Sequence, residues 1–195
     1  MNSQELIGDS TYLKYKVLQV KANELDKAKR FSEEAMKNCV KLGSRPKFQT
    51  HELTNKMMGY LGELKFYQFM NQKGKWDPQP DGKTDGGVDW TSPMGHKVDV
   101  KTRKWNCPPR TFHPMPVVKE NFIGHPPQYY VFCSVPDEMN YVRILGYISY
   151  QDFKDNAVFL KRGEKMLYCV NKNDSYHVKG HHLKHDIIEK FGGIT

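Results

Sequence analysis

The chain has 195 residues, is 38% hydrophobic and carries a formal net charge of +8. This length suits a single domain, with enough apolar residues for one core. No apolar run is long enough to span a membrane, and residues 1–10 lack the basic-then-apolar order of a secretory signal. We therefore expect a soluble, cytoplasmic protein. The basic charge favours a polyanionic partner, although a basic surface can also serve solubility alone.

The first third of the chain is predicted to be helical. Residues 21–42 are charged and follow a helical pattern. A second helix is predicted over residues 49–72, where apolar residues recur at helical spacing. Within a single domain, we expect an N-terminal helical extension at about residues 1–48 and a core at about 49–195.

The core is predicted to be built mainly from strands. A loop rich in Lys, Gly, Pro and Asp over residues 73–87 precedes two short strands joined by a turn. Prolines make residues 105–128 a predicted irregular segment. Strands are then expected at 128–135, 141–148 and 166–170, and helices at 150–160 and 183–191. This order predicts an α/β fold, with a central mixed sheet flanked by helices.

The two short strands around Asp89 and Asp99 are the most informative part of the sequence. Successive side chains of a strand point to opposite faces, so Asp99, Lys101 and Arg103 share one face. The other face of this strand carries valines and suits a core. Asp89 lies between apolar neighbours, where a carboxylate needs a partner or a metal ion.

These residues could bind a divalent cation and act on a phosphodiester. Mg²⁺ prefers hard oxygen ligands and usually keeps several waters, so Asp89, Asp99 and the carbonyl of Val100 could supply the protein ligands. Lys101 would then orient or help to deprotonate the attacking water, or stabilise developing charge. The alternative is an ordinary ion pair, because an acid two residues before a lysine is common by chance. Asp81 and Asp85 lie in the preceding loop and suit turn positions, with Asp85 open as a further ligand.

Glu63 is the candidate acid upstream, on the second predicted helix. Aromatic residues lie three and four positions away, and Gly59 and Gly62 would let a strand approach this helix closely. The alternative is a solvated glutamate at the edge of an amphipathic helix, as most helical acids are.

Together, a helical glutamate, Gly-Val-Asp, a turn and Val-Asp-Val-Lys resemble the motif of the PD-(D/E)XK nuclease superfamily, over about residues 55–150. The resemblance implies a restriction-endonuclease-like fold and a divalent-metal-dependent nuclease, similar to small phage or prokaryotic nucleases that act inside the cell. The proline that often precedes the first aspartate is replaced by Val88. The resemblance implies Mg²⁺ as cofactor, with Mn²⁺ expected to substitute for it. It makes four side chains candidate catalytic residues, Glu63, Asp89, Asp99 and Lys101, and gives the candidate metal ligands as Glu63, Asp89, Asp99 and Val100.

Basic and aromatic residues after the motif suit contacts to phosphates and bases. We predict nucleic-acid binding by Arg103, Lys104, Trp105 and Arg110. DNA is the expected partner, with RNA open as an alternative, no membrane is expected, and a homodimer is a candidate assembly by analogy. Two other classes stay open: a non-catalytic nucleic-acid-binding protein and a protein-interaction module, the latter supported only by the proline-rich segment.

Other potential metal ligands give weaker signals. The four cysteines are far apart and form no CxxC pair, so we expect neither a zinc site nor a disulfide framework. His181 or His182 would share a face of the predicted C-terminal helix with His185. That spacing can bind a transition metal, but a surface or capping role is the more common outcome.

Overall fold

The computed structural model describes residues 12–41, 50–78, 87–118, 126–166 and 169–192. Its centre is a five-stranded sheet with the strand order β1-β6-β5-β3-β2. The β3 and β5 strands are parallel, whereas the other neighbouring strands are antiparallel. The predicted mixed central sheet flanked by helices is therefore confirmed. In chain order the five strands are β1 (Lys16–Gln19), β2 (Trp90–Thr91), β3 (Lys97–Lys104), β5 (Tyr129–Val135) and β6 (Tyr141–Ser149).

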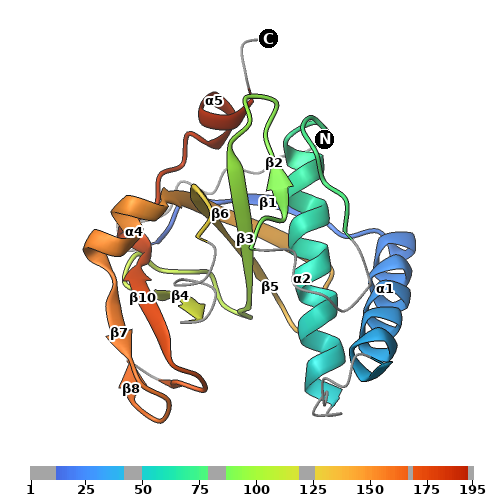
Figure 1. The fold of residues 1–195 in the computed structure, drawn as a ribbon, viewed down its shortest axis with the longest axis horizontal. Coiled ribbons are helices and arrows are strands. Elements are labelled where there is room, and N and C mark those ends of the chain that lie inside the picture. Colours follow the sequence, from blue (N-terminus) through green and yellow to red (C-terminus); the bar gives the residue numbers. More distant parts are fainter. Residues whose placement is uncertain (1–11, 42–49, 79–86, 119–125, 167–168, 193–195) are drawn as a thin grey trace.

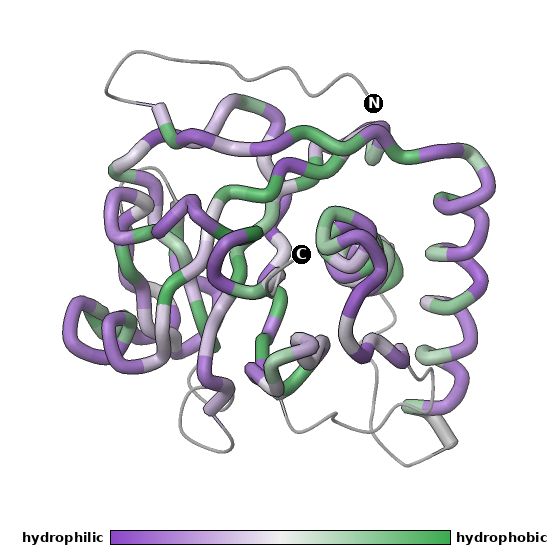
Figure 2. The backbone as a smooth tube through the Cα atoms, turned by 90° about the horizontal axis from the view of Figure 1, so that it is seen from above, coloured by the Kyte–Doolittle hydropathy of each residue, from purple (hydrophilic) through white to green (hydrophobic). Residues whose placement is uncertain are grey.

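The two long helices predicted near the N-terminus are present, and they lie on one side of this sheet. They are α1 (Ala22–Lys41) and α2 (Thr50–Phe69), and α2 lies between α1 and the sheet (Figure 2). The α2 helix places Leu61 and Phe66 in the same buried cluster as Val98 of β3 and Val131 of β5. Burial of this apolar surface is the main force that holds the layer together.

A buried ion pair joins the two helices. Glu24 of α1 accepts a hydrogen bond from Lys65 Nζ of α2 at 2.6 Å and another from Gln68 Nε2 at 2.7 Å. Burial alone would raise the pKa of Glu24, but its hydrogen bonds to Lys21 N, Lys65 and Gln68 outweigh this effect and hold the pKa below its usual value.

A small antiparallel sheet lies on the other side of the central sheet (Figure 1). Its strand order is β4-β10-β7, and a short hairpin of β8 and β9 extends from it. Met115 and Val178 of this sheet share a buried cluster with Tyr130 and Phe132 of β5. The elements on this side are β4 (Pro114–Val118), α4 (Tyr150–Asn156), β7 (Val158–Leu160), β8 (Lys165–Met166), β9 (Cys169–Val170) and β10 (Ser175–Lys179), followed by η1 (Gly180–His182) and α5 (Ile187–Phe191).

The prediction of an irregular segment over residues 105–128 is wrong for β4, which contains two prolines. In the small sheet β4 has only β10 as a neighbour. The N–H groups on its other edge therefore have no partner strand within this sheet. Pro114 and Pro116 are two residues apart and therefore face the same edge. Proline is tolerated in a strand where its missing N–H would point away from the partner.

Predictions for the C-terminal third need three further corrections. The helix predicted over 150–160 ends at Asn156, because Val158–Leu160 pair with β10 instead. The single strand predicted over 166–170 is a hairpin of two short strands, β8 and β9, with residues 167–168 outside the described part. The helix predicted over 183–191 begins only at Ile187.

The histidine cluster changes with that last correction. His181 and His182 belong to η1, with ring centroids 4.2 Å apart, whereas His185 precedes α5. The three histidines therefore do not share the face of one α-helix. Among the described residues, no helix combines the length and the apolar character needed to cross a membrane.

Candidate functional site

The two faces of β3 carry the side chains that alternation predicts. Val98 and Val100 are buried in the cluster that includes α2. Asp99 is opposite Tyr130 of β5, whose side chain belongs to the cluster beneath the small sheet. The strand therefore separates an apolar face from a polar face, and the polar face carries Asp99, Lys101 and Arg103.

Asp89 lies against the edge of β3, just before β2. Its backbone N–H donates to the carbonyl of Val98 at 2.9 Å, and its Oδ2 accepts a hydrogen bond from the N–H of Val100 at 2.6 Å. Because β2 is only two residues long, this carboxylate takes the place of the next ladder acceptor. The carbonyl of Val100 points to the same edge as its N–H, as in any extended strand.

Asp99 and Lys101 are brought together on the polar face. Lys101 Nζ lies 2.7 Å from Asp99 Oδ2, and the side chains are 24% and 2% exposed, respectively. A carboxylate buried to this extent requires a nearby positive charge, and Lys101 supplies one. The pair thus has one inaccessible acid and one lysine that still reaches solvent.

Glu63 is half-buried on α2 and turned towards the β2 side of the sheet. Its Oε2 accepts a hydrogen bond from Trp76 Nε1 at 3.3 Å, and the Trp76 ring packs on Tyr60 and Tyr67. Trp76 directly follows Lys75, which bridges to Thr91 of β2. Burial and the nearby charges of Glu63 and Glu24 raise the pKa of Tyr60.

One of the two glycines near Glu63 behaves as predicted. A Cβ atom added to Gly62 would lie 1.9 Å from Thr102 Oγ1, so the absent side chain lets α2 approach β3. The prediction is wrong for Gly59, where an added Cβ would meet no atom within 4 Å.

The donor set offers a partial match to a magnesium site. Among the described residues, no three His, Cys, Asp or Glu side chains are grouped to hold a metal ion, so Glu63 does not complete such a group with Asp89 and Asp99. Two carboxylates and the Val100 carbonyl still suit Mg²⁺, which binds through few protein oxygens and retains waters. Asp81 and Asp85 lie outside the described residues.

Three of the four predicted nucleic-acid contacts gather around His113. The Trp105 ring lies 4.9 Å from that of His113 and has the Arg103 guanidinium 5.3 Å from its centroid. Burial, together with Arg110 and Arg103, lowers the pKa of His113. Lys104 is instead placed beside Asp137, in an exposed ion pair of 2.7 Å. The four nucleic-acid roles stay predictions.

The sequence reasoning missed three polar residues on this face: Tyr130, Ser134 and Arg143. Arg103, Ser134 and Arg143 are aligned across β3, β5 and β6, and Arg143 is only 4% exposed. Burial and Asp99 raise the pKa of Tyr130. Alternation in QYYVFCSV shows that Tyr130 and Ser134 share a face of β5. Whether Asp99 of β3 lies on that same face depends on the register between the two strands.

His177 of β10 is a further buried group near Arg103. It is 5% exposed, and one ring nitrogen, Nε2, lies 2.8 Å from Ser175 Oγ. Burial and the charge of Arg103 lower the pKa of His177 to about 4, so the ring is neutral at pH 7.

Comparisons with known proteins give no assignment. No protein-family model matches the chain, and the search of curated protein sequences gives no significant match.

Proposed function

We propose that this chain is a divalent-metal-dependent nuclease that hydrolyses phosphodiester bonds in DNA. The observation that carries the proposal is the arrangement around Val100. Asp89 accepts the hydrogen bond of the Val100 N–H at the strand edge, while Asp99 and Lys101, on either side of Val100, lie 2.7 Å apart. This arrangement supports the resemblance to PD-(D/E)XK nucleases at its most specific positions.

Each residue has a distinct role in the proposed reaction. Asp89, Asp99 and the Val100 carbonyl would hold Mg²⁺, which when bound polarises the scissile phosphate and lowers the pKa of a water. Lys101 Nζ would position that water by hydrogen bonding or stabilise the charge that develops on the phosphate. Arg103 would hold a neighbouring phosphate. Glu63 is left out of this set, because it bonds Trp76 on the α2 side and does not group with Asp89 and Asp99 among the described residues.

A non-catalytic nucleic-acid-binding protein is the second candidate. It is favoured by the absence, in the part of the chain that the structure describes, of a three-residue metal-ligand group. This candidate predicts that binding survives EDTA and the substitution Lys101→Ala, and that no substrate is cut.

A cleavage assay separates the two candidates. Labelled duplex, single-stranded and branched DNA, and RNA, are incubated with Mg²⁺, Mn²⁺ or EDTA. We expect Mg²⁺- and Mn²⁺-dependent cutting that falls by about 100-fold or more in Asp99→Asn and Asp89→Asn. Asp137→Asn removes an exposed carboxylate beside Lys104 and serves as the matched control. Wild-type protein that binds these substrates tightly but cuts none of them would contradict the nuclease proposal.

A further inference from the structure

A basic hairpin, defined here as residues 158–166 and 169–174, extends from the small sheet. The pairing of β7 with β10 holds its base, and β8 pairs with β9 further out. Between these pairs, the N–H of Gly163 donates to the carbonyl of Asn171, and the N–H of Asn171 donates to that of Glu164, both at 2.8 Å. Figure 1 shows the hairpin at the lower left, directed away from the central sheet. Its described residues thus form an arm held by backbone pairing from β7 and β10 out to β8 and β9.

The acids of the basic hairpin bond to its own backbone, whereas its cations do not form salt bridges among the described residues. Its two acids hold the backbone of the turn: Glu164 Oε2 accepts from the N–H of Lys161 at 2.8 Å, and Asp174 Oδ1 accepts from that of Arg162 at 2.9 Å. Its four cations are all exposed, and none is in a salt bridge among the described residues: Lys161, Arg162, Lys165 and Lys172. The acids therefore fix the shape of the arm, and the cations remain available to a ligand.

The exposed cations of α1 provide a contrast. Lys29 and Arg30 each precede an acid by four residues, Glu33 and Glu34, on the same helical face. Pairs at this spacing neutralise each other locally. Cations with acids at helical spacing suit a solvated helix, whereas cations whose neighbouring acids are bonded to backbone N–H groups suit a polyanion.

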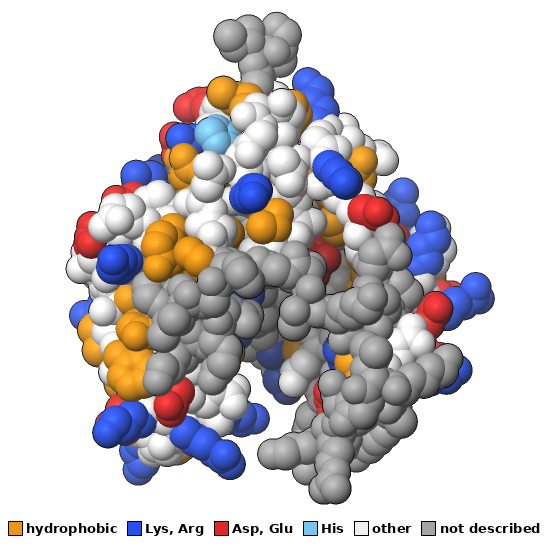
Figure 3. All heavy atoms as spheres, viewed as in Figure 1, with side chains coloured by type: hydrophobic (Ala, Val, Ile, Leu, Met, Phe, Trp, Pro, Cys, Tyr) orange, Lys and Arg blue, Asp and Glu red, His pale blue; other side chains and the backbone are white. Residues whose placement is uncertain are grey.

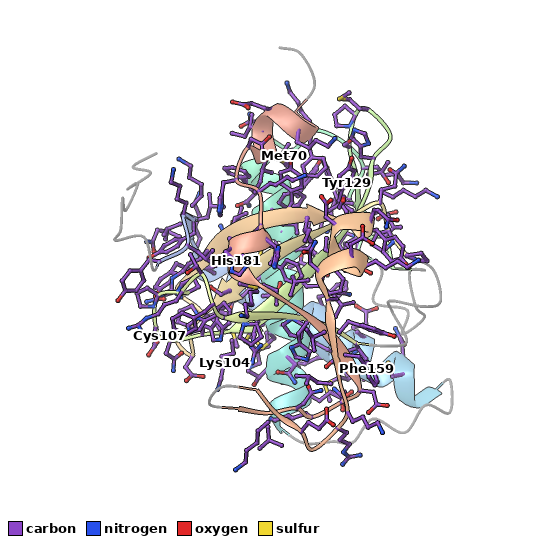
Figure 4. All side chains as sticks on the ribbon, turned by 90° about the vertical axis from the view of Figure 1, so that its left-hand side faces the viewer. Met70, Lys104, Cys107, Tyr129, Phe159 and His181 are labelled. Carbon is purple, nitrogen blue, oxygen red and sulfur yellow. The ribbon has the colours of Figure 1, made fainter. Side chains whose placement is uncertain are left out.

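The basic hairpin also lies in the same part of the molecule as the end of β3. In the space-filling view, Lys and Arg side chains lie at the lower left, on the side of the small sheet (Figure 3). In the side view, Phe159 of β7 and Lys104, at the end of β3, both lie in the lower part of the molecule (Figure 4). Arg103 of β3 donates to the carbonyl of Pro114 at 3.1 Å and so ties the small sheet to the strand that carries Asp99.

We propose that the basic hairpin grips the sugar-phosphate backbone of the nucleic acid, outside the site where the bond is cut. This inference rests on the proposed function and deepens it by assigning the surface that holds the substrate. The cations are spread along both sides of an extended arm rather than gathered in a pocket, which suits successive phosphates better than one small anion. Binding would release counterions from these phosphates, so its signature is a salt dependence.

The test measures equilibrium binding to a short labelled DNA duplex in EDTA, over a range of salt concentrations. The hairpin variant neutralises all four cations, Lys161→Gln, Arg162→Gln, Lys165→Gln and Lys172→Gln. The control variant removes the same charge from α1, Lys27→Gln, Lys29→Gln, Arg30→Gln and Lys37→Gln.

We expect the hairpin variant to bind roughly tenfold or more weakly at low salt and to lose about 0.9 in the log–log salt slope for each phosphate contact removed. The control should bind within about threefold of wild type, because Lys29, Arg30 and Lys37 each have an acid three or four residues away on the helix. A charge-conserving variant, with Lys161, Lys165 and Lys172 changed to Arg, should bind like wild type.

The possible outcomes separate this inference from the proposed function. Wild-type protein that cuts DNA, together with a hairpin variant whose affinity and salt slope are unchanged, would overturn the hairpin inference alone. So would an equal loss in the α1 control, or weaker binding with the wild-type slope. Wild-type protein that neither binds nor cuts nucleic acid would overturn both. All four hairpin cations are exposed, so thermal unfolding of the variant should match wild type.

Discussion

The two faces of the central sheet are built on different principles. Towards α2, β3 presents Val98, Val100 and Thr102, and Thr102 packs closely against Gly62. This contact depends on steric fit. Towards the small sheet, it presents Asp99, Lys101 and Arg103 beside buried hydroxyl groups on β5. The first face stabilises the fold, because apolar burial and close packing have no requirement for a ligand. The second carries costly buried polar groups, as sites of chemistry often do.

The largest expected effect tests whether the polar face is a site of chemistry. Lys101 and Lys104 lie on the same strand but on opposite faces, which makes them a matched pair. We expect Lys101→Ala to lower kcat by about 100-fold or more, the usual contribution of a donor that stabilises charge in the transition state. Lys104→Ala should leave kcat at saturating substrate close to wild type. An equal loss of kcat in both variants would mean that the faces do not differ in function.

The next effect concerns pH and the buried ring of His177. Its pKa is about 4 in the folded protein, well below the usual histidine value, so on acidification the unfolded chain takes up a proton first. The stability from this residue is complete above about pH 6.5 and is lost as the pH falls towards 4, by about 3 kcal/mol at most. Urea unfolding of wild type and His177→Gln between these pH values measures the difference. The same slope in His177→Gln as in wild type would contradict the prediction.

A smaller effect is expected from the close contact on the apolar face. Gly62→Ala places a Cβ atom 1.9 Å from Thr102 Oγ1 and should destabilise the protein by about 1–3 kcal/mol, as overpacking does. In a Thr102→Ala background most of this loss should disappear, because the obstructing hydroxyl is gone. Gly59→Ala, which meets no neighbour, should be neutral or stabilising by up to about 1 kcal/mol. Chemical denaturation of these four variants gives the coupling energy, and simple additivity would contradict the steric explanation.

The smallest effects are expected from two hydroxyls on the polar face. Tyr130 and Ser134 are fully buried, and their oxygens have no hydrogen-bond partner within the described structure. Tyr130→Phe and Ser134→Ala should therefore change the free energy of unfolding by less than about 1 kcal/mol, and Tyr130→Phe should tend to stabilise. A loss of more than about 2 kcal/mol in either variant would reveal a hydrogen bond that each hydroxyl makes in solution.

The sequence allowed the layers of the fold to be predicted because the strongest patterns are local. Helical periodicity predicted α1 and α2, and alternation along β3 correctly assigned Val98 to the core and Asp99 to the other face. The errors fell where tertiary context overrides local preference. Pro114 and Pro116 are acceptable in β4 only because that strand lies at a sheet edge. Val158–Leu160 leave the predicted helix because β10 offers a partner.

The candidate site could be predicted only in part for the same reason. The Asp99–Lys101 pair depends on a spacing of two within one strand, which the sequence displays directly. Tyr130, opposite Asp99, and Arg143 and His177, near Arg103, come from three other strands, and their proximity depends on register and strand order. Alternation alone cannot supply either quantity. The hydrogen bond from Val100 to Asp89 depends likewise on where the short β2 strand ends.

The N-terminal part of the chain cannot be separated from the rest as an extension. The β1 strand pairs with β6 and forms an edge of the central sheet, and Glu24 neutralises Lys65, which is only 3% exposed. Removal of residues before α2 would strip the edge from β6 and expose the surface of α2 that packs on α1, a loss of buried apolar area that destabilises the fold. Natural or engineered shortening of this sequence should therefore be tolerated at loop tips rather than at its beginning.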